Sequence, residues 1–580
     1  MATTSAAGLA GCSGGGGDSS SSGDSGGDLG ERVPALTVAS MTSVAGASSI
    51  EQANKHVAKQ LTDVIGVPAS VQGKELTTLW NEAYSDSRTF NYHVDLTPPF
   101  PRFLDPDPMI YPYNINAAGK GGPNVINYAN CDYSKKVEAQ RTAANPDERH
   151  NIVNEAVSIA SDDVAPTTLV TNTASGVYRT DQLDAKNIGK AGTVGRNPQF
   201  LWSTTTTNGA SGIRSNATPS NINNKVYFVN QPASPWTGTV YTPLVFRDKN
   251  YELAAGAAND WTVENEYKKF TFNLRDGMTF HNGDDLTSED VKWTLEFLNQ
   301  NAGDTFPPVA KYPYKSIETP DDTTVVVTME SSQPSWLNAF VPIWSGVLPK
   351  QVWQDAGAEE NPKDPDFDQI VGSGPFEVVQ FQPRQLLALE PFEDHYNPAE
   401  TSLTFRGYSD RQAAKRAFQA GDLNLIINST EDTNSQLADE LGDKVKIVNA
   451  SSFVSYELRA QHSFAPTMFK EFRLAVSQSL NRLRINSYLS AGKGEPELYS
   501  SFLGKTHPWR PPEDDLTKIA DSPQGNTDKA KQILKDAGWG WDGDGRLHYP
   551  PDKDLTPPWP EQSSPCENPD GFPCLPDLCQ

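Results

Sequence analysis

The N-terminal part of the chain alternates apolar runs with amphipathic stripes, and this alternation restricts the fold more than any other feature. Residues 36–38, 67–71 and 90–94 are short runs rich in β-branched and aromatic side chains, which predict strands. Between them, residues 49–65 and 74–84 repeat apolar side chains at helical spacing, which predicts two helices. Strands that alternate with helices join through right-handed crossovers into one parallel sheet. We therefore predict a parallel α/β layer covered by helices.

Residues 241–298 form a second constrained stretch, with two strands, two tight turns and the start of a helix. The runs 242–246 and 270–274 carry aromatic and β-branched side chains and end in charged turns, which predicts strands. Asn282-Gly283 is a turn dipeptide, because both residues accept a positive φ. Thr287 precedes acidic residues and an apolar stripe, so we expect it to cap a helix.

This stretch resembles the signature region of the family 5 extracellular solute-binding proteins, the oligopeptide and dipeptide receptors of ABC importers. The family pattern runs approximately YEPL, LA..W, F.LR.G..FH.G and LT..DV. The matching residues are Tyr241, Pro243, Leu244, Leu253, Ala254, Trp261, Phe272, Leu274, Arg275, Gly277, Phe280, His281, Gly283, Leu286, Thr287, Asp290 and Val291. The resemblance implies an α/β periplasmic-binding-type (type II) fold of two lobes and a smaller subdomain. It also implies a receptor that closes on a solute, without enzymatic activity and without a cofactor.

The blocks that resemble the family occur in a rotated order. Residues 372–376 are similar to its GTGPY segment, and residues 528–539 are similar to a helix that ends in AGW. In the family a second half follows that helix, and here the similar block occupies residues 60–164, near the start. The resemblance therefore implies a circular permutation joined near residues 200–224, which is possible where the ancestral termini are neighbours. Fused gene fragments are the alternative explanation.

This interpretation divides the chain into four parts and predicts their packing. Residues 1–32 form a lipobox and a flexible tether, 36–90 with 451–560 one lobe, 91–450 the second lobe with its subdomain, and 561–580 a Cys- and Pro-rich tail. We expect the helices at 50–65 and 528–537 to share the first lobe. By the same logic, the segment 133–170 is expected in the lobe of residues 241–298.

Charge and hydropathy exclude several classes of protein. The net charge of -25 argues against a nucleic-acid partner, because phosphate binding needs a basic face. No apolar run approaches the roughly 18 residues of a membrane-spanning helix. A densely acidic surface suits high salt, where ions screen it, so a haloarchaeal-type halophilic source is one interpretation. An ordinary acidic secreted protein is the other.

The cysteines suggest an exterior location. Residues 9–12, Leu-Ala-Gly-Cys, match a lipoprotein processing box in which Cys12 would carry the lipid, and a Gly/Ser/Asp tract follows as a tether. The residues before Cys12 lack the basic and apolar regions of a signal peptide, so a truncated start and a chance match both stay open. Four cysteines remain, and they allow three pairings. A small loop closed by Cys566 and Cys574 is one candidate.

The cleft between the lobes is the expected ligand site. In the family, an acid in the segment that matches residues 90–107 commonly binds a peptide's ammonium group, so the resemblance makes Asp95, Asp105 and Asp107 the candidates. A carboxylate that fixes a turn before proline is the alternative for each. By position in the family pattern, Trp344 and Trp202 would line the cleft. We find no catalytic triad and no metal-ligand spacing.

We therefore predict a lipid-anchored, monomeric receptor on the outer face of the cell membrane. It would capture peptides or a similar small solute and deliver them to an ABC permease. A surface adhesion or signalling receptor on the same fold is one alternative, and a secreted hydrolase is another. The sequence leaves the identity of the solute open.

Overall fold

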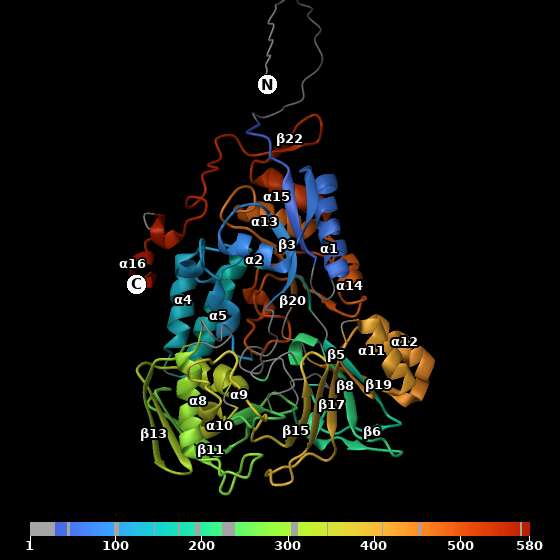
Figure 1. The fold of residues 1–580 in the computed structure, drawn as a ribbon. Helices are drawn as coiled ribbons and strands as arrows, with labels where there is room; N and C mark the ends of the chain where they lie inside the picture. The colour runs from blue at the N-terminus through green and yellow to red at the C-terminus, as the bar shows by residue number, and fades with distance from the viewer. Residues whose placement is uncertain are drawn as a thin grey trace, which may run out of the picture.

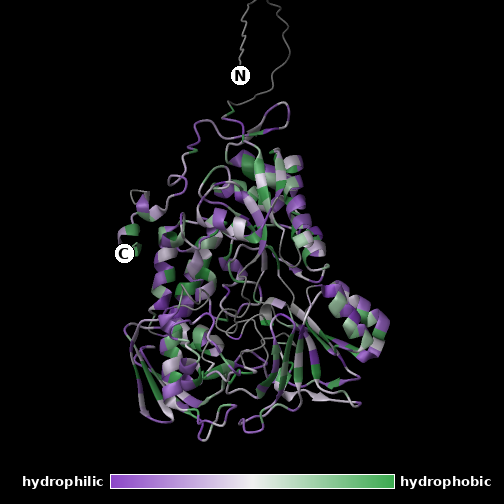
Figure 2. Ribbon diagram, viewed as in Figure 1, coloured by the Kyte–Doolittle hydropathy of each residue, from purple (hydrophilic) through white to green (hydrophobic). Residues whose placement is uncertain are grey.

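The molecule has two lobes, one above the other in Figure 1. The computed structural model describes residues 29–579, apart from 43–46, 98–103, 144, 172–173, 192–197, 218, 223–224, 226–237, 303–310, 345, 409, 451–452, 454 and 569–570. Each lobe has its own large hydrophobic core. Figure 2 shows hydrophobic residues concentrated in the strands and on parts of the helices in both lobes. The predicted two-lobe α/β fold is confirmed.

The first lobe is built on a six-stranded mixed sheet in the order β2-β1-β3-β20-β4-β21. Its strands are β1 (Leu36–Met41), β2 (Ala69–Lys74), β3 (Tyr92–Thr97), β4 (Thr167–Thr171), β20 (Ser455–Ala460) and β21 (Glu495–Pro496). As predicted, β1 pairs in parallel with both β2 and β3. β20 runs antiparallel to β3 and β4, and β21 antiparallel to β4. Strands from the two ends of the chain thus share one sheet.

Helices cover this sheet. They are α1 (Ala47–Gln60), α2 (Leu76–Tyr84), α4 (Cys131–Arg141), α5 (Pro146–Asp162), α13 (Lys470–Ser479), α14 (Arg482–Leu489) and α15 (Thr527–Asp536). α1 continues into a π-helical turn, η1 (Leu61–Ile65), which ends at Gly66 with a φ of 85°. The apolar stripes of α1 and α15 lie in the same core, as expected from the sequence, since both bury side chains in it.

The segment 133–170 was predicted in the wrong lobe. Val137 on α4 and Val153 and Val157 on α5 belong to the core that also holds Ile50, and β4 is a strand of the first sheet. An apolar helix stripe requires burial but does not specify which core receives it. Residues 92–171 therefore belong to the first lobe, and the predicted boundary near residue 91 moves to the link between β4 and β5 (Ala174–Arg179).

The second lobe, residues 174–450, contains two larger sheets. The seven-stranded sheet has the order β15-β16-β17-β8-β18-β5-β19, and the four-stranded sheet has the order β11-β12-β14-β13. Their strands after β5 are β8 (Ile213–Ala217), β11 (Ala258–Glu264), β12 (Lys269–Leu274), β13 (Tyr314–Asp321), β14 (Thr324–Met329), β15 (Phe376–Gln382), β16 (Leu386–Pro391), β17 (Leu403–Gly407), β18 (Leu425–Ser429) and β19 (Val445–Ala450). The strand predicted at 270–274 is the core of β12, whereas the one predicted at 242–246 is shifted to the short β9 (Val245–Arg247).

Helices and short hairpins complete the second lobe. The helices are α6 (Pro198–Ser203), α8 (Ser288–Gln300), α9 (Val341–Trp344), α10 (Lys350–Asp355), α11 (Arg411–Ala420) and α12 (Glu431–Leu441), and β9 pairs with β10 (Leu253–Ala255). Thr287 caps α8 as predicted, through a reciprocal capping box with Asp290. α11 and α12 pack beside the seven-stranded sheet around a smaller core that contains Phe418 and Leu437.

The chain crosses between the lobes at two neighbouring places. One crossing links β4 to β5, and the other links β19 to β20. β4 and β20 are paired in the first sheet, and β5 and β19 are paired in the second. Two adjacent links of this kind are typical of a hinge between domains.

Two disulfides fix the C-terminal tail, and they correct the predicted pairing. Cys131, at the start of α4, is bonded to Cys574, and Cys566 is bonded to Cys579, so Cys566 and Cys574 do not close a loop together. Cys574 and Leu575 pack with Ile115 in a small apolar cluster of the first lobe. This packing brings Cys574 beside α4, which sequence proximity alone did not indicate.

Within the described residues, no helix is sufficiently long and apolar to span a bilayer.

Candidate functional site

A cavity of about 490 Å³ lies where the two lobes face each other. The first lobe contributes Leu104, Asp105, Thr506, Pro508 and Trp509, and the second contributes Lys190, Arg247, Asn250, Tyr251 and Asn338. Phe453, in the link between β19 and β20, completes the wall. The volume is within the range of about 300–1,000 Å³ that small-molecule sites occupy. A solute held here would contact both lobes and one of the crossings.

Asp105 reaches the cavity wall, but Arg149 holds its carboxylate. The two guanidinium Nη atoms donate to the two carboxylate oxygens at 2.6 Å each, and both side chains are almost fully buried. Asn145 caps α5 and Pro146 occupies its first turn, which places Arg149 in the second turn of this helix. Burial would lower the pKa of Arg149, but Asp105 raises it above its ordinary value. Asp105 also accepts from the backbone N–H of Asp107, so it starts the turn into α3 (Asp107–Ile110).

Asp107 and Asp95 do not line the cavity. Asp107 is buried, accepts a hydrogen bond from the side-chain amide of Gln140 and forms a 3.3 Å ion pair with Arg141. Burial raises the pKa of Asp107, and Arg141 opposes this shift. Asp95, on β3, forms a 3.1 Å ion pair with Arg459 on the neighbouring β20. Each of the three candidate acids thus has an arginine partner, and only Asp105 is placed beside the cavity.

The two tryptophans predicted from the family pattern have different positions. Trp202 lies in α6, is 6% exposed and packs edge-on against Phe246 in the core of the second lobe. The structure therefore does not place it among the cavity residues. Trp344 is the last residue of α9, and its side chain lies outside the described part of the structure.

The cations of the cavity were not predicted from the sequence. Arg247 ends β9, and its guanidinium donates to the carbonyls of Tyr251 at 3.0 Å and Asn338 at 2.8 Å. Burial lowers the pKa of Arg247 to about 10, although the Asp105 charge opposes this effect. Lys190 is exposed at the cavity rim. The available signal for Arg247 was its place directly after an apolar run, where a strand ends and its last side chain can enter a cleft.

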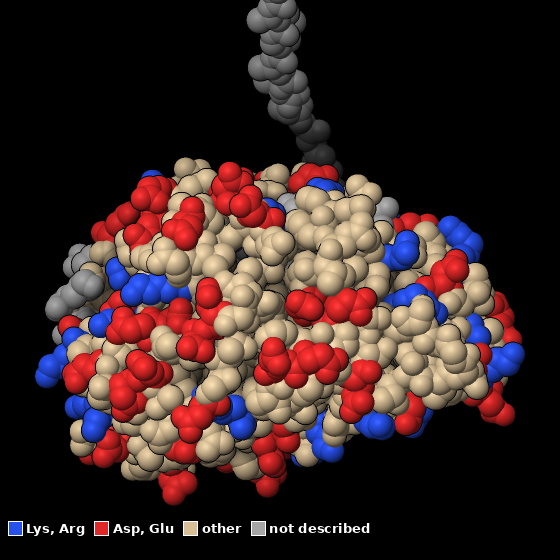
Figure 3. Space-filling model, turned by 60° about the horizontal axis from the view of Figure 1, so that its bottom comes forward, with Lys and Arg blue, Asp and Glu red and all other residues tan. Residues whose placement is uncertain are grey.

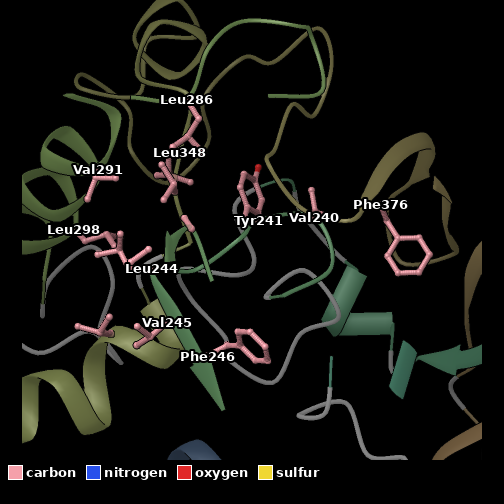
Figure 4. Packing of buried hydrophobic residues seen from close by; sticks show 14 of the residues in the cluster. Val240, Tyr241, Leu244, Val245, Phe246, Leu286, Val291, Leu298, Leu348 and Phe376 are labelled. Carbon is pink, nitrogen blue, oxygen red and sulfur yellow. The ribbon is translucent and has the colours of Figure 1, made fainter. Parts of the chain in front are cut away.

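The signature region itself has a structural role. His281 accepts a hydrogen bond from the N–H of Gly372 at 3.0 Å, and its other ring nitrogen lies 3.1 Å from the carbonyl oxygen of Gly374. A Cβ on Gly372 would lie 2.0 Å from the carbonyl oxygen of Val240, so the close crossing of these segments requires glycine. Val240 and Tyr241 belong to the buried apolar cluster of the second lobe, part of which Figure 4 shows. Two family blocks far apart in sequence are thus in direct contact.

The model of the family 5 bacterial extracellular solute-binding proteins matches residues 252–568, which is more than half of the chain. The chain belongs to this family. Family 5 members are solute-binding transport receptors rather than enzymes. The described residues contain no group of three or more His, Cys, Asp or Glu side chains placed to hold a metal ion.

Relatives within family 5 match parts of the chain. The oligopeptide-binding protein AppA of Bacillus subtilis is 26% identical over 344 residues, which are 56% of this chain and 59% of AppA. The dipeptide-binding protein DppE of the same species is 24% identical over 315 residues, 50% of this chain and 54% of DppE. The solved structure of B. subtilis AppA with a nonapeptide aligns at 24% identity with a TM-score of 0.44, covering 60% of this chain and 67% of that chain. The chain spans slightly more than half the length of the curated relatives it matches.

Proposed function

We propose that the chain is an extracellular, monomeric receptor of an ABC importer that captures a peptide, or a similar small solute, between its lobes. The observation that carries this proposal is the cavity of about 490 Å³ with walls from both lobes. Membership of family 5 supports the receptor role. Relatives named as oligopeptide- and dipeptide-binding proteins support peptides as the solute class.

The mechanism follows from the two crossings. A solute that contacts both lobes binds the closed arrangement more tightly than the open one, so it shifts the population toward closure. The paired crossings let the lobes rotate as units, because each pair of strands stays intact in its own sheet. The closed receptor would then deliver the solute to a membrane permease.

Thermal unfolding in the presence of candidate solutes tests this function. A ligand present at 100 times its dissociation constant stabilises the folded state by about 2.7 kcal/mol. We expect a pool of short peptides to raise the melting temperature, and nickel chelates, sugars and haem to leave it unchanged. A rise of the melting temperature with one of those other classes would identify that class, rather than peptides, as the solute. No rise with any of them would contradict the receptor function.

We further propose that Cys12 anchors the protein to the outer face of the membrane. Cys12 lies outside the described residues, so the support is its processing box and the polar tract after it. The first described residues pair with the hairpin of β22 (Gly540–Trp541) and β23 (Leu547–His548), at the end of the first lobe that lies away from the second lobe in Figure 1. A tether there leaves the cavity accessible. The net charge of -25 and the many acidic side chains on the face in Figure 3 suit a salt-rich exterior.

We also infer that the chain order is a circular permutation of the family order. Support comes from the core that α1 shares with α15 and from the sheet that joins β1, β2, β3 and β4 to β20 and β21. Fused fragments that fold separately would instead form separate sheets. The contacts between residues 30–33, at the start of the described part of the chain, and residues 547–549 supply the neighbouring ends that a permutation requires.

A further inference from the structure

The cavity between the lobes has an excess of positive charge in a strongly acidic protein. Lys190 and Arg247 are its cationic lining residues, and Asp105 is the acidic one among the described residues that line it. The protein as a whole carries a net charge of -25. Composition alone would therefore predict an acidic cavity, and the observed charge is opposite to that expectation.

The single acid of the cavity is already paired. Asp105 receives two 2.6 Å hydrogen bonds from Arg149, and the exposed fractions of the two side chains are 0% and 2%. Releasing this carboxylate to a ligand's ammonium group would leave Arg149 buried and unpaired, which is strongly unfavourable. The negative charge of Asp105 is therefore directed to the protein interior rather than to a ligand.

Arg247, in contrast, has no carboxylate partner within ion-pair distance in the part of the chain that the structure describes. Its guanidinium donates hydrogen bonds to the neutral carbonyls of Tyr251 and Asn338, which fix its orientation. A guanidinium has five N–H donors in a planar fork that fits a carboxylate. Burial lowers its pKa, as expected for a cation without full compensation, yet it remains charged at neutral pH.

We propose that the cavity holds its ligand by an anionic group, and that this group is the terminal carboxylate of a short peptide. This inference rests on the proposed peptide-receptor function and adds which end of the peptide is recognised. Arg247 and Lys190 bind the carboxylate, and the wall formed by Tyr251, Phe453 and Trp509 contacts the apolar part of the ligand. Tyr251 and Phe453 pack edge-on at 5.1 Å, which gives this wall a fixed shape. A free amino terminus is not required.

Three forms of one randomised tripeptide pool test this proposal with the full chain. The pools have free termini, an acetylated amino terminus or an amidated carboxyl terminus, and equilibrium dialysis followed by mass spectrometry measures what the protein retains. We expect the free and acetylated pools to be retained alike, and the amidated pool at least about tenfold less, since a hydrogen bond to a charged group is lost. Equal retention of the free and amidated pools would overturn the inference while the peptide-receptor function stands. A loss of retention caused by acetylation alone would also overturn the inference.

Variants at the cavity and near it test whether the cations of the cavity cause the preference for a free carboxyl terminus. Lys190→Met should lower retention of the free pool and leave that of the amidated pool unchanged. Lys186→Met is the matched control, because Lys186 is an exposed lysine on the same segment that does not line the cavity. Arg247→Gln should lower retention further, provided that its circular dichroism is native. If that variant does not fold, the Lys190 and Lys186 pair decides alone. If Lys190→Met and Lys186→Met lost retention of the free pool equally, the proposal would be overturned. If the protein retained none of the three pools, both the proposal and the peptide-receptor function would be overturned.

Discussion

The backbone N–H of Gly30 donates a 3.0 Å hydrogen bond to the carbonyl oxygen of Tyr549, although the two residues lie near opposite ends of the chain. Tyr549 in turn donates to Glu31 at 2.9 Å, and Val33 donates to Leu547 at 2.9 Å. The segment that leads into β1 therefore continues the small sheet of β22 and β23. Under the circular permutation that we propose, a connection between these two segments would give the chain order of family 5.

This geometry predicts that the order of the chain can be rotated back. The rotated variant begins at Ala210, runs through the tail, continues through a Gly/Ser linker of about 25 residues to Gly30 and ends at Gly209. Such a linker spans about 25–30 Å on average. Gly209 has a φ of 74° and open space around its Cβ position, so a break there disturbs no packing. We expect a melting temperature within a few degrees of the parent.

A control break belongs inside a buried strand. Opening the chain between Thr271 and Phe272 interrupts β12, whose residues pair with both β11 and β14. This variant should not fold. If the variant opened at Gly209 were equally unfolded, the permutation would lose its physical basis.

The anchor predicts where the protein partitions. In the native host, with its full signal sequence, Cys12→Ala should move the protein from the membrane fraction to the medium, because the thiol that would carry the lipid is absent. Immunoblots of both fractions measure this, with Cys12 unchanged as the reference. Persistent membrane association of the variant would exclude lipidation at Cys12.

The disulfides predict a specific peptide map. Proteolysis without reduction should yield peptides linked through Cys131–Cys574 and through Cys566–Cys579. Cys131→Ser with Cys574→Ser removes the link that closes the longer loop, and we expect it to cost about 2–5 kcal/mol of unfolding free energy. Denaturant titration measures the loss, and removal of the short Cys566–Cys579 link should cost less. A Cys566–Cys574 peptide in the map would contradict the connectivity.

The buried pair of Asp105 and Arg149 predicts a strong asymmetry between single and double variants. Asp105→Asn leaves the Arg149 charge buried without its partner, which should cost roughly 3–5 kcal/mol of stability. Combining Asp105→Asn with Arg149→Met should recover a large part of that loss, because no unpaired charge remains. Chemical denaturation of the three variants gives the coupling between the two sites.

An exposed ion pair supplies the control for the variants of Asp105 and Arg149. Lys59 and Asp63 form an ion pair along α1 and η1 with 63% and 50% of their side chains exposed. Asp63→Asn should change stability by less than about 1 kcal/mol, because solvent screens such pairs. A similarly small effect of Asp105→Asn would show that Asp105 is free to serve a ligand, as the family resemblance implies.

Two buried histidines predict a loss of stability in mild acid. Burial lowers the pKa values of His281 and His395 to about 4, from an ordinary value of 6.5. The unfolded state therefore takes up protons first as the pH falls, so stability is fully present above about pH 6.5 and is lost progressively toward pH 4. Each histidine should contribute on the order of 2–3 kcal/mol to this loss.

His281→Gln tests the assignment by removing one of these two histidines. The variant loses the ring bonds to the segment of Gly372 and Gly374, so its stability at pH 7 should be lower than that of the parent. Its free energy of unfolding should nevertheless fall less steeply between pH 6.5 and pH 4.5. Urea titrations at a series of pH values measure the two slopes, and identical slopes would refute the role of His281.

Local sequence patterns were sufficient for much of the secondary structure and for the fold class. The capping box at Thr287, the alternation in β12 and the apolar stripe of α1 each depend on residues close together in the chain. The signature from Tyr241 onward correctly indicated the family. Patterns of this kind are informative because periodicity decides which face of an element must be buried.

The site residues were less predictable. The sequence drew attention to Asp105 through its place before proline, but Arg149, which engages its carboxylate, is brought there by α5. Arg247 and Lys190 come from different segments of the second lobe, and neither carries a local motif. Their role appears only when the lobes bring them to one cavity.

The sequence by itself determined that this chain has a two-lobe α/β fold. The spacing of apolar residues and turns indicated many of its strands and helices, and the resemblance to family 5 indicated the two lobes. The tertiary structure alone decided that residues 92–171 join the first lobe, that Cys131 pairs with Cys574, and that the cavity is cationic. The physical reason is the same in each case. An apolar stripe, a thiol or a charge specifies what kind of partner it needs, whereas the choice among distant partners depends on how whole elements pack.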